Sequence, residues 1–210
     1  QVRRATQGFD GSMRADQAAP LVFATWADEL TRGVLGGKLG KDLFGTLYGK
    51  RHFRSSIETI METNDAAWCG SAGCPAQSAA ALERAMNRLQ AEYGSDVGQW
   101  TWGRAHQALS AHRPFANVPL FAKFFDVKVP TGGDTFTVNV GQYWSTDGKT
   151  AFTSRQAASM RAIYDMADLE NSRFIYQTGQ SGLVFSSRYR DMRDTWAEVG
   201  YRPLQMNPAS

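Results

Sequence analysis

The sequence predicts an α+β fold, with helices in the first half of the chain and antiparallel strands in the second half. Up to about residue 115, apolar side chains recur every three to four positions, which is typical of helices that bury one face. Farther along, apolar and polar residues alternate, which is typical of half-buried strands. We therefore expect a mainly helical part over residues 1–115. Antiparallel strands and a C-terminal helix should follow over residues 116–210.

Two long helices are expected in the first part. The first spans residues 19–34 and ends at the glycine pair 36–37, because an apolar stripe runs along it at four-residue steps. The stripe consists of Val22, Trp26, Leu30 and Val34. The second begins at Pro75 and ends at Gly94, and residues 40–65 between the two are helical but weakly patterned. Its expected buried face consists of Ala81, Leu82, Ala85, Met86 and Leu89.

The second part should contain one strand, one hairpin and one helix. Residues 135–140, TFTVNV, alternate as in a half-buried strand and follow the turn PTGGD. Residues 158–178 are expected to form an antiparallel hairpin, in which ADLEN is the turn. Ser186 or Ser187 then caps a final helix that Gly200 closes. The expected buried face of this helix is Tyr189, Met192, Trp196 and Val199.

The composition excludes several classes of protein. A hydrophobic content of 42% with 12% aromatic residues is incompatible with bulk disorder. No apolar run approaches the roughly 20 residues that a membrane-spanning helix needs. The net charge is only +3 and the basic residues are scattered, so we expect neither a nucleic acid nor a membrane as a partner. The chain begins with Gln1, which suggests a processed or recombinant chain whose targeting peptide is already removed.

Cys69 and Cys74 are the two cysteines of the chain. Together with three histidines they cannot complete a tetrahedral zinc site. A small-loop disulfide in an oxidising compartment is therefore favoured over two free thiols.

The segment around Ser181, GQSG, resembles the Gly-x-Ser-x-Gly turn that exposes the nucleophile of α/β-hydrolases. Leu183 occupies the place of the second glycine, and no histidine follows in the chain. We therefore expect a structural segment, in which Gly179 and Gly182 adopt unusual φ angles. The hydroxyl groups that should satisfy loop and helix-start N–H groups are those of Ser181, Ser186 and Ser187.

No other residues form a catalytic or metal-binding pattern. The three histidines lack the spacing of zinc proteases, and a structural role is favoured over that of a base. They are His52, His106 and His112. The glycine-rich PTGGDTF lacks the lysine and helix of a phosphate cradle. Two acidic pairs are expected to serve solubility or capping: Asp165 with Asp168, and Asp191 with Asp194.

Seven segments follow one another across nearly the full chain in a distinctive order. They are GFDGSMRADQAAPLVFATWADEL, WCGSAGCPAQSAAALERAMNRL, WTWGRAH, GGDTFTVNV, AASMRAIYDMAD, TGQSGLVFSSRYRD and WAEVGYRPL. In this order the chain resembles the C-terminal part of the β chain of the penicillin acylase (penicillin amidase) family. It departs from that pattern at Arg188, where the family usually has histidine. Gly70 and Ser71 also stand where the family usually has an aspartate pair.

The resemblance implies an N-terminal-nucleophile amidohydrolase with an αββα sandwich, of which this chain is a fragment. In that family, a precursor cleaves itself to expose a serine whose own α-amino group serves as base, and linear amides are hydrolysed through an acyl-enzyme. Backbone amides and an asparagine stabilise the oxyanion. These residues and the calcium ligands of the family lie outside the matched region. The resemblance therefore implies no catalytic residue, no metal ligand and no cofactor in this chain.

The implied partners are the remainder of the same precursor and a small-molecule amide. The remainder comprises the α chain and the N-terminal part of the β chain, and the implied location is the periplasm or outside the cell. A sheet taken from a larger sandwich should leave an apolar face or an open strand edge. Two alternatives are a stand-alone binding or assembly module and an independent hydrolase that uses Ser181. The acyl group remains open among penicillin, cephalosporin and acyl-homoserine lactone substrates.

Overall fold

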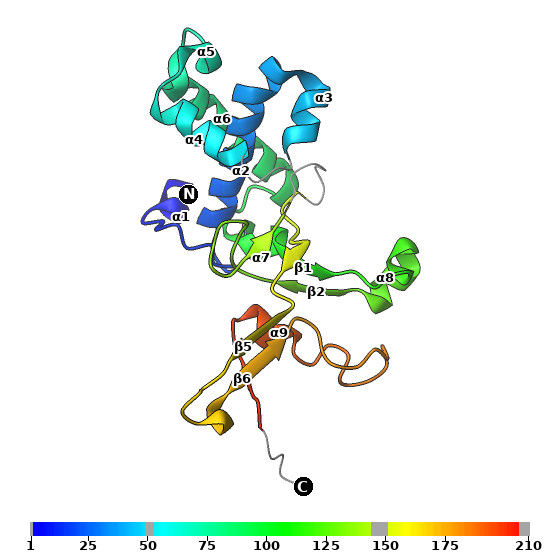
Figure 1. Ribbon diagram of the computed structural model, residues 1–210. Coiled ribbons are helices and arrows are strands. Elements are labelled where there is room, and N and C mark those ends of the chain that lie inside the picture. Colours follow the sequence, from blue (N-terminus) through cyan, green and yellow to red (C-terminus); the bar gives the residue numbers. More distant parts are fainter. Residues whose placement is uncertain (1, 49–52, 144–150, 206–210) are drawn as a thin grey trace. The chain divides into compact units, whose positions relative to one another are not determined.

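The computed structural model describes residues 2–48, 53–143 and 151–205 and confirms the α+β class. The chain divides into two compact units, which are described separately below (Figure 1). Within the described residues, unit 1 comprises residues up to Ala105 together with Ala151 and Phe152. Unit 2 comprises residues 106–143 and 153–205.

Unit 1 is helical in its described part. Its elements are α1 (Val2–Thr6), α2 (Ala19–Thr31), a π-helical turn η1 (Arg32–Gly36), α3 (Gly37–Tyr48), α4 (Phe53–Glu62), α5 (Ala66–Cys69), α6 (Gly73–Tyr93), the 3-10 turn η2 (Val97–Gln99) and α7 (Trp102–Ala105). Helices α2 and α6 pack against each other and form the centre of the unit.

The predicted stripe on α2 is largely buried, because Val22, Leu30 and Val34 are in the core and Trp26 is half-buried. On α6, the prediction holds for three of five residues, which lie one helical turn apart: Ala81, Ala85 and Leu89. Met86 is half-buried, and Leu82 is 44% exposed, so its assignment to the buried face is wrong. A buried stripe at four-residue steps leaves position 82, about 100° around the helix, facing solvent.

The first helix does not end at the glycine pair 36–37, which corrects the prediction. The π-helical turn runs directly into α3, and Gly37 itself has helical angles (φ −66°, ψ −29°). The chain breaks instead at Gly40, where φ is 73° and ψ is 163°. Glycine can remain helical at a modest cost, and the burial of Val34 and Leu35 favours the continued turn. Gly94, by contrast, ends α6 as predicted, with a φ of 86°.

An ion-pair network centred on the buried Asp28 joins α2 to α6. The Asp28 carboxylate lies 2.5 Å from the Arg88 guanidinium and 3.1 Å from that of Arg32. Glu29 extends the network to Arg88 and Arg84, at 3.3 and 3.4 Å. Burial raises the pKa of the Asp28 carboxyl, while the two arginines favour its charged form. The buried Asp28 carboxylate thus depends on Arg88 and Arg32 to remain charged, while the arginines themselves stay partly exposed.

Unit 2 combines short strands with short helices. Its elements are β1 (Gln107–Ser110), the 3-10 turn η3 (Phe115–Asn117), α8 (Pro119–Phe125), β2 (Val127–Pro130), β3 (Gly141–Gln142), β4 (Gln156–Ala157), β5 (Met160–Ile163), the 3-10 turn η4 (Leu169–Asn171), β6 (Arg173–Tyr176), α9 (Arg193–Ala197) and β7 (Arg202–Pro203). In the described residues these strands form three antiparallel sheets, β1–β2, β3–β4 and β5–β6–β7.

The hairpin predicted over 158–178 is confirmed. Met160 of β5 pairs with Tyr176 of β6, and η4 lies in the turn between the strands. Ile175 is buried together with Trp196 of α9, so the sheet and this helix share one core. Met160 and Ile163 are exposed, and β5 has no described strand on its outer side. Of the two expected features, an apolar face or an open strand edge, the open edge is thus present at β5 in the described residues.

The strand predicted over 135–140 is wrong, because this segment is a compact turn. The Asp134 carboxylate accepts a hydrogen bond from the Phe136 N–H at 2.7 Å, and the Thr137 hydroxyl accepts one from the Asp134 N–H at 2.8 Å. Such local bonds compete with a strand ladder. Gly133 has a φ of 86°, and a Cβ there would overlap the Asn139 carbonyl oxygen. The alternating pattern reflects a tight loop that leaves its apolar side chains outside.

The final helix is shorter than predicted. Only Arg193–Ala197 are helical, and residues 186–192 form turns. The Ser186 hydroxyl accepts the Arg188 N–H at 3.1 Å, which stabilises a turn rather than a helix start. Tyr189, Met192 and Trp196 are buried as expected. Val199 is also expected to be buried, but it is exposed. It lies beyond the end of the helix and has a φ of 61°.

Candidate functional site

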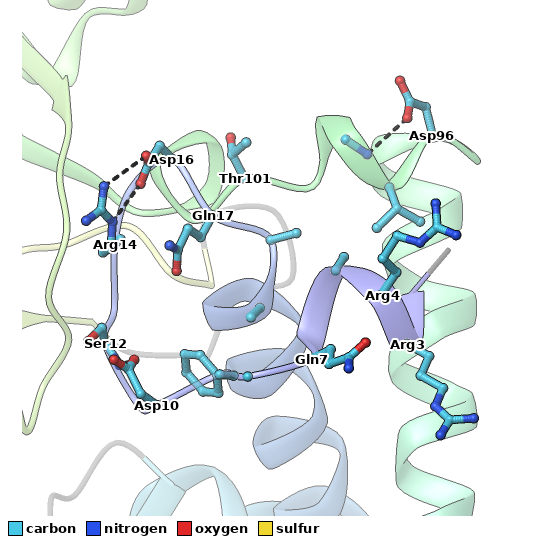
Figure 2. A pocket seen from close by; sticks show the side chains of 17 residues that line it. Arg3, Arg4, Gln7, Asp10, Ser12, Arg14, Asp16, Gln17, Asp96 and Thr101 are labelled. Atoms are coloured by element: carbon cyan, nitrogen blue, oxygen red, sulfur yellow. Dashed lines mark hydrogen bonds and ion pairs between the residues drawn. The ribbon is translucent and has the colours of Figure 1, made fainter.

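An open pocket of about 1040 Å³ lies in unit 1 between α1, the segment 8–19 and the segment 96–101 (Figure 2). The charged and amide side chains that line it are Arg3, Arg4, Gln7, Asp10, Arg14, Asp16, Gln17 and Asp96. The lining includes neither a cysteine nor a histidine. No sequence motif marks this pocket, because its residues come from three separate segments.

The carboxylates of the pocket are engaged locally. Asp10 accepts the Ser12 N–H at 2.9 Å, which lowers the pKa of its carboxyl. The Asp16 carboxylate lies 3.2 Å from the Arg14 guanidinium, whose hydrogen bond lowers the pKa of Asp16. Figure 2 shows the Arg14 and Asp16 side chains turned toward each other. The pocket is therefore a polar surface whose carboxylates are held by local turns.

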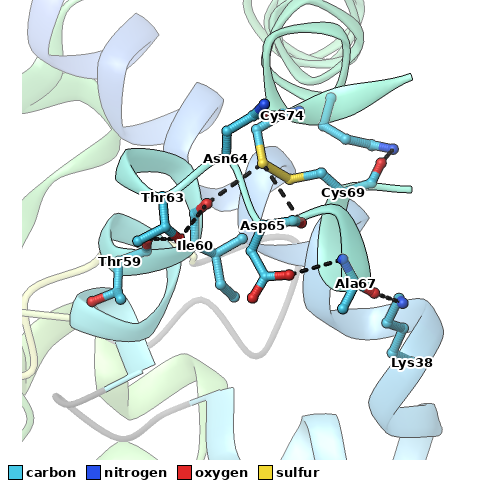
Figure 3. Close-up of a disulfide and its surroundings, with 10 residues drawn as sticks. Lys38, Thr59, Ile60, Thr63, Asn64, Asp65, Ala67, Cys69 and Cys74 are labelled. Atoms are coloured by element: carbon cyan, nitrogen blue, oxygen red, sulfur yellow. Dashed lines mark hydrogen bonds between the residues drawn. A yellow bond between two sulfur atoms is a disulfide. The ribbon is translucent and has the colours of Figure 1, made fainter. Parts of the chain in front are cut away.

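The disulfide between Cys69 and Cys74 is present and joins the end of α5 to the start of α6 (Figure 3). Both cysteines are buried in the core of unit 1. The Asn64 side chain accepts the Cys74 N–H at 3.0 Å, and Asp65 caps α5 by accepting the Ala67 N–H at 2.8 Å. The disulfide is thus buried at the junction of α5 and α6, where its role is to stabilise the structure.

Ser181 lies in the loop between β6 and α9, and its hydroxyl is used by the backbone. Its Oγ accepts the Leu183 N–H at 3.1 Å, and its own N–H donates to the Arg188 carbonyl at 3.1 Å. The Ser186 hydroxyl binds an N–H in the same way. The predicted service of these two hydroxyls to loop N–H groups is confirmed. Among the described contacts of the Ser181 hydroxyl there is no histidine.

The role predicted for the neighbouring glycines is wrong, because neither has a positive φ. Gly179 is required by space instead, since a Cβ there would overlap the Arg188 carbonyl oxygen. A Cβ on Gly182 would meet nothing within 4 Å. The close approach of two backbone segments therefore explains the first glycine, and the structure gives no reason for the second.

The histidines are not brought together. His106 precedes β1 and is fully buried, with its ring 5.8 Å from that of Tyr143. His112 follows β1 and stacks on Phe115 at 5.2 Å. His52 lies outside the described residues. The two described histidines thus stand at opposite ends of one strand.

Unit 2 also buries polar residues that sequence reasoning did not single out as a group. They are Thr131, Asp134, Ser154 and Ser172, which are buried like His106. Gly141 approaches this region closely, because a Cβ there would overlap the imidazole of His106. Of these residues, only Asp134 belongs to a segment that stands out in the sequence, GGDT. Its carboxylate fixes the turn that follows.

The acidic pairs have structural partners. Asp168 accepts the Glu170 N–H at 3.2 Å and caps η4, which confirms its predicted capping role, whereas Asp165 accepts the Ala167 N–H at 3.0 Å within a turn. Asp191 lies 2.8 Å from Arg202 and 3.1 Å from Arg188.

Within the described ranges, no three His, Cys, Asp or Glu side chains group closely enough to hold a metal ion. No helix in the same ranges is long and apolar enough to cross a membrane.

Comparison with known proteins adds the following. The sequence profile described as penicillin amidase matches residues 2–210. An acyl-homoserine lactone acylase QuiP from Pseudomonas syringae pv. syringae is 32% identical over 209 residues, which is 93% of this chain and 25% of that protein. The QuiP acylase of Pseudomonas putida is 32% identical over 219 residues, with 95% and 25% covered. The penicillin acylase 2 proenzyme of Pseudomonas sp. (strain SE83) is 29% identical over 104 residues, with 49% and 13% covered. The chain thus spans about a quarter of the length of the QuiP acylases.

Proposed function

The chain belongs to the penicillin amidase family, and on that premise we propose that it is the C-terminal structural portion of a larger amidohydrolase. The observation that carries the proposal is the match along residues 2–210, combined with coverage of only a quarter of the acylase relatives. The complete enzyme would hydrolyse linear amide bonds through an acyl-enzyme. Its nucleophile would lie outside these 210 residues.

The chemistry of the described residues supports a structural contribution. Hydrolysis through an acyl-enzyme needs a nucleophile, a base and donors for the oxyanion. The Ser181 hydroxyl accepts a backbone N–H, and the described histidines are packed against aromatic rings. What the chain offers is an open-edged sheet packed on α9 and a helical unit joined by ion pairs around the buried Asp28. We assign it the role of supporting a catalytic centre formed elsewhere in the αββα sandwich of the complete enzyme.

We propose N-acyl amides as the substrate class, with N-acyl-homoserine lactones first among them. Relatives named acyl-homoserine lactone acylase match nearly the whole chain, whereas the penicillin acylase relative matches about half of it. A panel of acyl-homoserine lactones of different chain length, together with penicillin G, separates these substrates.

The proposed location is the periplasm or the outside of the cell. The supporting observation is the disulfide, because such bonds persist in oxidising compartments. Cell fractionation with antibodies against this chain tests the location, and recovery with the cytosol would contradict it.

The proposed function is tested on the longer polypeptide that the gene encodes. Purified from its native host, it should contain an internal cleavage that exposes a serine as the first residue of a new chain, and it should release homoserine lactone from the acyl derivatives. The proposal fails if no such serine is found and no amide on the panel is hydrolysed. In that case the alternative of a binding or assembly module gains support.

A further inference from the structure

Exposed apolar side chains are distributed unevenly between the units. Among the described residues of unit 1, the large hydrophobic side chains that are exposed are Leu43 and Leu82. All the others lie in unit 2, and the densest group is found between residues 115 and 125. Soluble proteins rarely leave such groups in contact with water, and a concentrated apolar patch marks an interaction surface.

The segment 115–125 closes the end of the β1–β2 pair and is firmly built. Figure 1 shows α8 at the far end of these two strands. The ring of Phe115 lies 4.6 Å from that of Phe125 and 5.8 Å from that of Phe121. The Asp126 carboxylate accepts the His112 N–H at 3.0 Å and so ties the two ends of the segment together. Phe124 nevertheless leaves 58% of its surface exposed.

The loop that contains the GQSG segment is attached to the same place. The Tyr189 hydroxyl donates to the Phe125 carbonyl at 2.5 Å, and the Arg190 guanidinium donates to the Phe124 carbonyl at 2.9 Å. This loop exposes two further apolar side chains, Leu183 and Phe185, and Phe185 is 90% exposed. We call the exposed apolar residues of both segments the aromatic surface. It consists of Phe115, Val118, Leu120, Phe121, Phe124, Leu183 and Phe185.

Positive charges border the aromatic surface. Arg113, Lys123 and Arg190 are exposed beside it, and no described carboxylate forms an ion pair with any of the three. A partner that fits this surface therefore has an apolar groove with acidic residues at its rim. Because the rings are held in place before binding, docking would cost little ordering entropy.

We propose that the aromatic surface is the site at which this chain docks on the remainder of the same precursor, in an apolar groove with an acidic rim. The inference rests on the proposed function. The relatives are about four times as long as this chain, and the remainder of a polypeptide of that length would provide the partner surface. In the complete enzyme the aromatic surface would be buried, and the GQSG loop would serve assembly.

Cysteine labelling tests the proposal. Leu120→Cys, on the aromatic surface, and Leu43→Cys, as exposed reference in unit 1, are introduced into the 210-residue chain and into the longer polypeptide. Both thiols should react with a maleimide at similar rates in the short chain. In the longer polypeptide, Leu120→Cys should react at least tenfold more slowly than in the short chain. Equal rates for Leu120→Cys in the two proteins would overturn the proposal.

The charge argument has its own test. Lys123→Glu in the longer polypeptide should restore at least threefold faster labelling of Leu120→Cys, whereas Lys41→Glu, an exposed lysine of unit 1, should not. If Lys123→Glu leaves the labelling rate of Leu120→Cys unchanged, the claim that the partner groove has an acidic rim is wrong. Protection of the cysteine in the short chain, accompanied by dimer formation, would assign the surface to a second copy of the chain. Protection only in the presence of phosphatidylglycerol vesicles would assign it to lipid. Either result would overturn the proposal.

Hydrolysis by the same longer polypeptide without cysteine substitutions separates the two claims. Activity without protection of position 120 removes the docking site and leaves the proposed function intact. Protection without activity leaves the docking site and removes the proposed function.

Discussion

At Gly179 the chain passes so close to the Arg188 carbonyl oxygen that a methyl group would overlap it. Two residues later, the Ser181 hydroxyl is held by the Leu183 N–H. A serine between two glycines can therefore mark a close crossing of two backbone segments as well as an active site. The distinguishing signs in the sequence are Leu183 and the absence of a following histidine.

The two glycines predict a matched pair of variants. Gly179→Ala should destabilise the protein by about 2 kcal/mol, because the backbone of the Arg188 segment must move to admit the methyl group. Gly182→Ala should leave stability within about 0.5 kcal/mol, because a Cβ there meets no neighbour. Urea denaturation of both variants checks the difference. Equal stability of the two would contradict the crossing.

Asp191 predicts how stability depends on pH. The hydrogen bond from Arg202, with that from Arg188, lowers the pKa of the Asp191 carboxyl. A lowered pKa in the folded state stabilises the fold above the ordinary carboxyl value of about 3.9, and this contribution is lost as pH falls through the lowered pKa. We expect Asp191→Asn to be less stable by about 2 kcal/mol at pH 7 and to lose less stability on acidification.

Asp194→Asn is the control for Asp191. Its side chain is 69% exposed and pairs only with the adjacent Arg193 among the described residues, so its replacement should change stability little. Unfolding curves recorded between pH 7 and pH 2 compare the variants. An unchanged acid slope in Asp191→Asn would show that another carboxylate carries this dependence.

At the scale of elements, the sequence predicts the long helices and the 158–178 hairpin, because their periodicity reflects burial of one face. Periodicity does not show where side chains compete with the hydrogen bonds between strands. For this reason it wrongly predicts a strand over 135–140, which is a turn fixed by Asp134. The short final helix has the same cause at Ser186. The pocket beside α1 depends on contacts between distant segments, which periodicity does not contain. The break at Gly40 uses the positive φ that glycine allows, and periodicity does not indicate which glycine of the segment breaks the helix.

The junction of α5 and α6 predicts the effect of the disulfide. Replacing both Cys69 and Cys74 by alanine should lower the free energy of unfolding by about 2 kcal/mol, because a short closed loop is released in the unfolded chain. Dithiothreitol should destabilise the parent protein by a similar amount and leave the double variant unchanged. A parent protein that unfolds identically with and without the reductant would contradict the structural role.

At the scale of the whole molecule, the docking proposal attributes the exposed apolar residues of unit 2 to a surface that the remainder of a longer polypeptide would cover, since the acylase relatives are about four times as long as this chain. Family membership could be predicted from seven ordered segments, because together they are specific although each is weak alone. The identity of the nucleophile could not, since the seven matched segments belong to a part of the family pattern that does not include it. The composition of the acyl pocket is open for the same reason.

The central claim is that these 210 residues support catalysis without performing it. The direct measurement is hydrolysis of an N-acyl-homoserine lactone by the 210-residue chain, by the longer polypeptide and by that polypeptide with Ser181→Ala. We predict no hydrolysis by the short chain and rates within twofold of each other for the two longer proteins. Hydrolysis by the short chain, or its loss in folded Ser181→Ala, would contradict the account.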